Sequence, residues 1–198
     1  MLERLSRIEG KISLLLHTCC APCSTTCIER LLEKCEITVF YYNPNIDDPL
    51  EYEKRKKEQK RFLEETGWGK WLACPYDREE FEKIANGLEN EPERGKRCYL
   101  CYELRLKATA KWAKEKGFDA FATTLSVSPY KNAEWLNEIG ERVGKEYGVE
   151  FLCADFKKQG GYYRSQELSK QYGLYRQDYC GCRFSKAEAE KKRKSNKE

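Results

Sequence analysis

The chain has 198 residues, of which 40% are hydrophobic and 35% charged, and its formal net charge is +4. This length suits a single folded domain with one core, and the composition excludes a disordered or fibrous protein. No stretch approaches the roughly 18 apolar residues of a membrane span, and the N-terminus has no apolar signal segment, so we expect a cytoplasmic protein with no membrane partner.

The first predicted elements form a βαβ unit. Residues 11–17 are a short apolar run, which is typical of a strand buried on both faces. We expect a helix over residues 24–34 and a second strand over 36–42, which stops at the Asn-Pro-Asn turn signal of residues 43–45.

Helices and short strands alternate along the rest of the chain. We expect strands over residues 71–73, 119–125 and 149–152. We expect helices over residues 51–65, 78–85, 98–116, 131–147, 165–172 and from 184 to the end, with Ser165 as a candidate N-cap. This order predicts one domain over residues 1–198, with a doubly wound α/β fold, helices on both faces of a mostly parallel sheet and a C-terminal helical segment. The charged tail from about residue 186 is expected to fray.

The cysteines predict a metal site. Thiols stay reduced in the cytoplasm, so eleven cysteines indicate metal ligands or redox thiols rather than a disulfide framework. Cys19 and Cys20 follow the first strand, at the sheet edge where α/β folds bind ligands. Cys98 and Cys101 are three residues apart at a helix start, so their thiols point the same way and their pKa values are lowered.

The nature of this site stays open at this point. Four thiolates suit either a 4Fe-4S cluster or a structural zinc ion, and the spacing does not separate the two. Cys23 competes as a ligand because residues 20–23 are themselves a Cys-x-x-Cys motif. Unrelated core or redox thiols are the third alternative.

A second pair of cysteines, Cys180 and Cys182, flanks a glycine near the end of the chain. A disulfide between them would close a small, strained ring that is easily reduced, which favours a redox-active pair. The alternative is two more metal ligands or plain thiols. His17 is the only histidine, which excludes a histidine-rich metal site. The other cysteines are expected to be packing residues: Cys27, Cys35, Cys74 and Cys153.

Aromatic and basic side chains are interleaved in the C-terminal third. Tyr163, Arg164 and Arg176 belong to this region, and Arg97 precedes the second cysteine group. Tyrosine and arginine planes stack on unpaired bases while arginine binds phosphates, so these residues are candidates for an RNA-binding rim around the cysteines. The alternative is that they are ordinary core or surface residues.

Six motifs occur in order between residues 11 and 185. They are His-Thr-Cys-Cys-Ala-Pro-Cys (17–23), Tyr-Asn-Pro-Asn-Ile (42–46), Arg-Cys-Tyr-Leu-Cys-Tyr (97–102), Thr-Thr-Leu-Ser-Val-Ser-Pro-Tyr-Lys (123–131), Gly-Gly-Tyr-Tyr-Arg-Ser (160–165) and Gly-Leu-Tyr-Arg-Gln-Asp-Tyr-Cys-Gly-Cys (173–182). Together they resemble QueH, the family of cobalamin-independent epoxyqueuosine reductases. The combination is far more specific than any one Cys-x-x-Cys motif.

The resemblance implies reduction of epoxyqueuosine to queuosine at the wobble base of tRNA, the last step of queuosine synthesis. It implies tRNA and an unidentified electron donor as partners, and no cobalamin. It also implies a 4Fe-4S cluster, with redox chemistry at Cys180 and Cys182; the surplus thiols leave room for an additional iron. The ligands that it implies are Cys19, Cys20, Cys98 and Cys101. The rivals are a zinc-stabilised RNA-binding module without redox activity and a thiol redox sensor.

The expected fold is also similar to that of the PP-loop ATP pyrophosphatases, a Rossmann-like (HUP-like) group. Their glycine-rich phosphate loop would fall at residues 18–24 of this chain. Those residues include cysteines and a proline but no glycine that would let the backbone wrap a phosphate. We therefore expect no ATP chemistry.

Overall fold

A parallel five-stranded sheet forms the centre of the molecule. The computed structural model describes residues 10–195. The strand order is β3-β2-β1-β4-β5, and every neighbouring pair is parallel. The strands are β1 (Ile12–His17), β2 (Cys35–Phe40), β3 (Lys70–Leu72), β4 (Ala120–Thr123) and β5 (Glu150–Phe151). The predicted Rossmann-like α/β architecture is confirmed.

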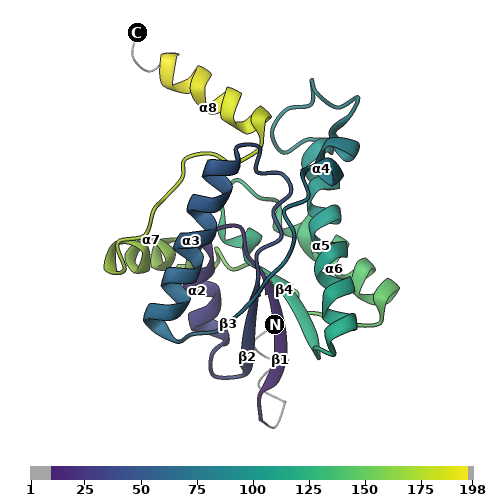
Figure 1. Cartoon of the computed structure of the whole chain (residues 1–198), viewed down its shortest axis with the longest axis vertical. Helices are drawn as coiled ribbons and strands as arrows, with labels where there is room; N and C mark the ends of the chain where they lie inside the picture. Colours follow the sequence, from purple (N-terminus) through teal and green to yellow (C-terminus); the bar gives the residue numbers. More distant parts are fainter. Residues whose placement is uncertain (1–9, 196–198) are drawn as a thin grey trace.

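Helices cover both faces of this sheet. On one side of the sheet lie α2 (Ala21–Leu31), α3 (Pro49–Thr66) and α7 (Gly161–Gln171), and on the other lie α5 (Lys96–Lys116) and α6 (Ala133–Tyr147) (Figure 1). The shorter α4 (Arg78–Ala85) contacts α5, and α8 (Arg183–Ser195) is the C-terminal helical segment. Within residues 10–195, no helix combines the length and the apolar character that crossing a membrane requires.

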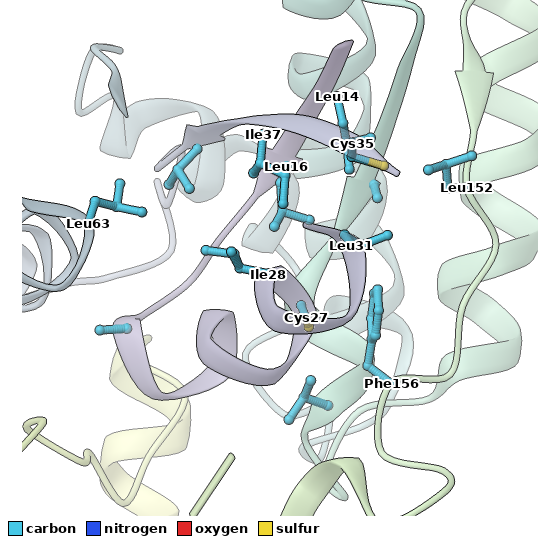
Figure 2. Close-up of a cluster of buried hydrophobic side chains, with 14 of the residues drawn as sticks. Leu14, Leu16, Cys27, Ile28, Leu31, Cys35, Ile37, Leu63, Leu152 and Phe156 are labelled. Carbon is cyan, nitrogen blue, oxygen red and sulfur yellow. The ribbon is translucent and has the colours of Figure 1, made fainter. Parts of the chain in front are cut away.

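The central strand explains why the sheet needs cover on both sides. Leu14 and Leu16 of β1 point into the cluster formed with α2, where they meet Ile28 (Figure 2). Leu15, between them, points into the opposite cluster with α5 and α6. All three leucines are fully buried. The continuous apolar run predicted this arrangement, because successive side chains of a strand point to opposite faces.

The strand order places a topological switch point between β1 and β4. The chain runs from β1 outward to β2 and β3, and then returns to the other side of β1 with β4. Loops that leave two adjacent strands in opposite directions open a crevice at the carboxyl edge of the sheet, where such folds bind ligands. Residues 18–20 leave β1 at this edge, and a 3-10 turn, η1 (Thr124–Val127), leaves β4 beside them.

Three expected boundaries are wrong. The first helix begins at Ala21 rather than at residue 24. Pro22 fits the first helical turn, because a backbone N–H at that position would form no hydrogen bond within the helix. Ser165 is not an N-cap: it lies inside α7 and its hydroxyl donates to the carbonyl of Tyr162 (2.6 Å). Helix α6 starts after Asn132, whose side chain caps it, and not at Lys131.

Candidate active site

Three cysteines gather at the carboxyl edge of β1. Cys19 and Cys20 belong to the short link between β1 and α2, and Cys23 lies in the first turn of α2. The three Sγ atoms all lie within 4.8 Å of one another, and those of Cys19 and Cys20 are 3.7 Å apart. The local sequence produces this cluster because Pro22 starts the helix at once, which brings Cys23 back beside Cys19 and Cys20.

The electrostatics of this first group favour a thiolate. Hydrogen bonds from Cys19 and Cys23 lower the pKa of the Cys20 thiol well below its usual value. The pKa of Cys19 is raised by its hydrogen bond to Cys20, and that of Cys23 is raised by the one to Cys19. Cys20 is therefore the thiol of this group that loses its proton most readily, and it lies at the N-terminus of α2, where the helix dipole also stabilises negative charge. Such a group is a soft, anionic ligand set for a metal.

A second cysteine group lies beside the first. Cys98 and Cys101, on the first turns of α5, line a small cavity together with Cys180 and Cys182. Burial raises the pKa of Cys101 to about 11 and that of Cys182 to about 12. Cys101 and Cys182 also pack together with Phe81 in a small apolar cluster. Without a metal, these two thiols are therefore protonated at neutral pH.

Cys180 borders both cysteine groups. It lines the small cavity and also the large one that contains Cys19 and Cys23. Lys131 Nζ donates to Cys180 Sγ at 3.1 Å, and Lys131 itself is buried. Gly181 holds the turn between the paired cysteines at φ +119°, which a side chain would not tolerate, and its carbonyl accepts from Asp47 N.

The structure divides the four cysteines that the sequence groups as cluster ligands. Cys19 and Cys20 lie in the first group with Cys23, whereas Cys98 and Cys101 lie in the second. All seven cysteines of the two groups are free thiols, so Cys180 and Cys182 are not joined by a disulfide. The ligand set and the redox role of the pair remain predictions.

The buried network behind the cysteines was missed by sequence reasoning. Arg105 Nε donates to His17 Nε2 (3.2 Å), and its Nη2 donates to the side-chain oxygen of Asn43. Asn43 is oriented by donating its own amide to Thr18 O (2.8 Å). Burial, followed by Arg105, lowers the pKa of His17 to about 3, so the imidazole is neutral. The only signal in the sequence is the place of Arg105 on the helix face that also carries Cys98 and Cys101.

The large cavity opens in front of the first cysteine group and has a volume of about 440 Å³. Its walls come from the η1 loop, from α7, from residues 176–180 and from α8. Among the candidate RNA-binding residues, Arg176 lines this cavity. Such a cavity is large enough for a modified base and is closed by parts of the chain that are far apart in sequence.

The other RNA candidates lie elsewhere. Tyr163 is 70% exposed on α7, next to Tyr162 of the cavity wall. Arg164 pairs with Glu29 at 2.6 Å, which ties α7 to α2. Arg97 is buried: it donates to the carbonyl of Leu88 (2.7 Å) and lies over the Phe184 ring. Arg97 and Arg164 therefore have structural partners within the chain.

Comparison with known proteins identifies the family. The model of the family described as "Epoxyqueuosine reductase QueH" matches residues 14–188. The chain belongs to the QueH family. The QueH protein of Staphylococcus epidermidis is 44% identical over 192 residues, which cover 93% of this chain and 81% of that protein. The Thermotoga maritima QueH is 37% identical, with 91% of this chain and 93% of that protein covered.

A solved structure supports the fold of this QueH chain. It is similar to "U34-tRNA thiolase NcsA from Methanococcus maripaludis with its 4Fe-4S cluster", with a TM-score of 0.58 and 13% sequence identity. The match covers 91% of this chain but 63% of the thiolase. At this identity the likeness concerns the fold alone. It agrees with the expected Rossmann-like fold.

Proposed function

We propose that this chain reduces epoxyqueuosine to queuosine at the wobble position of tRNA. Family membership gives the reaction class. The observation that carries the proposal is the cluster of three cysteine sulfurs within 4.8 Å, which faces a cavity of about 440 Å³ at the switch point of the sheet. A soft metal–thiolate centre and a base-sized cavity share one wall, as a reductase that acts on a base requires.

The donor set fits a 4Fe-4S cluster, which binds to cysteine thiolates. Cys19, Cys20 and Cys23 would supply three of them, since their sulfurs already lie within 4.8 Å of one another and the pKa of Cys20 is lowered. The fourth candidate is Cys101, which faces the same Arg105 guanidinium as Cys19. This proposal replaces Cys98 by Cys23 relative to the ligand set that the family resemblance implies.

The reaction needs two electrons and two protons. Both C–O bonds of the epoxide break, the oxygen leaves as water, and an alkene remains. When bound, a 4Fe-4S cluster supplies electrons singly. Oxidation of the Cys180 and Cys182 thiols to a disulfide would release two electrons and two protons and so would balance the reaction. A low-potential electron donor of unidentified nature would then restore both thiols.

The chain's own side chains would place the substrate and a proton. Lys131 Nζ lies 3.1 Å from Cys180 Sγ, so a proton donor stands beside the proposed redox pair at the cavity wall. Tyr162 and Tyr179 offer ring faces for an unpaired base, and Arg176 offers a cation for phosphate. With tRNA as its substrate and free thiols at its site, the enzyme would act in the cytoplasm.

The metal content of protein purified without oxygen tests the cofactor. We expect a brown protein that absorbs at about 400 nm and contains about four irons and about four sulfide ions per chain. Iron well above this value would indicate an additional iron, for which the second cysteine group is the candidate site. A colourless protein with tightly bound zinc would refute the cluster and favour an RNA-binding module without redox activity.

Single cysteine variants distinguish the two ligand sets. Cys23→Ser should lose most of the iron, whereas Cys98→Ser should retain it. Cys74→Ser is the control, because Cys74 is a half-buried thiol outside both cysteine groups. The opposite result for Cys23 and Cys98 would restore the ligand set implied by the resemblance.

Activity and tRNA binding test the remaining roles. A Cys180→Ser, Cys182→Ser double variant should bind iron normally but fail to turn over with the physiological donor. A normal rate would exclude the relay role. Binding of tRNA should weaken as salt concentration rises, because phosphate contacts release counterions. A flat salt response would count against the basic and aromatic cavity wall as an RNA surface.

A further inference from the structure

Arg105 is a buried cation without a carboxylate partner. Its side chain is 1% exposed, and it lies on α5 one turn beyond Cys101 and two turns beyond Cys98. It forms part of the wall of the large cavity. Among residues 10–195, no carboxylate lies within ion-pair distance of this guanidinium. Ion pairs elsewhere in this part of the chain include exposed ones, such as Arg61–Glu65 and Arg142–Glu103.

The hydrogen bonds of Arg105 do not neutralise it. The guanidinium has five N–H donors. One goes to the neutral imidazole of His17 and one to the amide oxygen of Asn43. Both acceptors are uncharged, so the full positive charge remains at the site. The network instead fixes the position of that charge, because Asn43 is itself held by Thr18 O.

Two of the three other buried cations in residues 10–195 have a carboxylate within 4 Å, whereas Arg97 donates to the carbonyls of Leu88 and Glu89 instead. Arg55, which is equally buried, has Glu51 at 2.7 Å. Lys131 has Glu93 at 3.7 Å. Burial of a charge is strongly unfavourable, and an opposite charge that faces it offsets this cost.

The groups that face Arg105 are cysteine sulfurs, which bind a metal as thiolates. Arg105 shares the wall of the large cavity with Cys19 and Cys180. Burial lowers its pKa, but Cys101, Cys19 and Cys180 outweigh that effect and raise the pKa overall. These sulfurs come from both cysteine groups, so the guanidinium stands between them. In this position the guanidinium can act as a fixed counter-charge to an anionic metal–thiolate centre.

We propose that Arg105 is a positioning residue that neutralises the cluster and raises its reduction potential. The proposal rests on the cluster described under the proposed function. Reduction adds one negative charge to the cluster, and a fixed cation in a low-dielectric site stabilises the reduced form more than the oxidised form. The hydrogen bonds that Arg105 donates to His17 and Asn43 would keep this cation at a constant distance from the cluster in both states.

A potentiometric titration followed by electron paramagnetic resonance tests the proposal on protein purified without oxygen. Arg105→Gln removes the charge. Asn43→Asp leaves the arginine in place but sets a carboxylate against it, with almost no change in shape. In both variants we expect the ratio of reduced to oxidised cluster at a fixed potential to fall at least tenfold, which for one electron corresponds to 59 mV. Arg105→Lys should stay near the wild-type value.

Thr109→Val is the matched control. Thr109 is buried one turn further along α5 and donates to the carbonyl of Arg105 (2.7 Å), so its loss disturbs the same helix without a change in charge. The reduction potential of the cluster in Thr109→Val should equal that in the wild type. Loss of iron from both charge variants, with retention in Thr109→Val, would also support the counter-charge role.

Two other results would overturn the proposal. One is an unchanged or raised potential in Asn43→Asp with its cluster intact. The other is an equal downward shift in Thr109→Val, which would point to general disturbance of the helix. Absence of any cluster from the wild type would instead refute the proposed function itself, so the two failures are distinguishable by iron and sulfide analysis.

Discussion

Gly161, the first residue of α7, provides a sharp test of the packing that positions one cavity wall. A Cβ atom at this position would lie 1.8 Å from the carbonyl oxygen of Phe156, whereas real Cβ contacts essentially never fall below 3.0 Å. The loop and the helix would therefore have to separate by at least 1.2 Å, the difference between these two values. The neighbour is backbone, so no side chain can rotate to relieve the contact.

The cost of Gly161→Ala follows from two terms. Overpacking of this kind destabilises by about 1–3 kcal/mol. The displaced loop also carries carbonyl groups that accept from Arg30, at 3.4 Å for Phe156, 3.2 Å for Lys158 and 2.9 Å for Gln159. Weakening these bonds adds about 0.5–1.5 kcal/mol. We expect the free energy of unfolding to fall by about 2–4 kcal/mol.

Urea unfolding of Gly161→Ala and Gly160→Ala measures this effect against a neighbouring control. Gly160 has a φ of +72° and no atom within 4 Å of an added Cβ, so its alanine variant bears backbone strain alone, about 1–2 kcal/mol. The reasoning fails if Gly161→Ala is as stable as Gly160→Ala. Since Tyr162 and Ser165 of α7 line the large cavity, the first variant should also bind tRNA more weakly.

Two further predictions concern ion pairs and acid stability. The hydrogen bond from Arg61 lowers the pKa of Glu58, against the effect of burial and with help from Tyr175 N–H. The unfolded chain therefore binds more protons near and below pH 4.5, so stability decreases as the pH is lowered through this range. Glu58→Gln should flatten this slope in urea titrations, and an unchanged slope would refute the assignment. In a double-mutant cycle, Arg164→Ala and Glu29→Ala should show a coupling of about 0.5–1 kcal/mol, and zero coupling would show that the pair does not anchor α7.

The sheet could be predicted from sequence because its signals are local. The apolar run of β1 is buried on both faces, and the predicted end of α5 at residue 116 is followed by Gly117 in a left-handed conformation. The start of α2 was misplaced because the cysteines around Pro22 were treated as a loop. A proline in the first helical turn predicts a helix as well as a turn, and the local sequence does not decide between them.

The site was predictable only in part because its assembly depends on long-range contacts. Each Cys-rich motif was visible in the sequence, but the sequence does not show that Cys98 and Cys101 meet Cys180 and Cys182 rather than Cys19. The burial of Arg105 could not be predicted from its place on the cysteine-bearing face of α5 alone, because an arginine on a long helix normally faces solvent. Its burial becomes visible only when the carboxyl edges of β1 and β2 are brought against α5.

The segment that completes the cavity is attached to α3 by polar contacts and comes late in the chain. Arg55 Nη1 donates to Cys180 O (3.0 Å), and Arg61 Nη2 donates to Tyr172 O (2.9 Å). During synthesis, Cys19, Cys20 and Cys23 are therefore made long before the wall that covers them. Enclosure of these thiols therefore depends on the docking of residues 172–180 against α3, after most of the sheet has been synthesised.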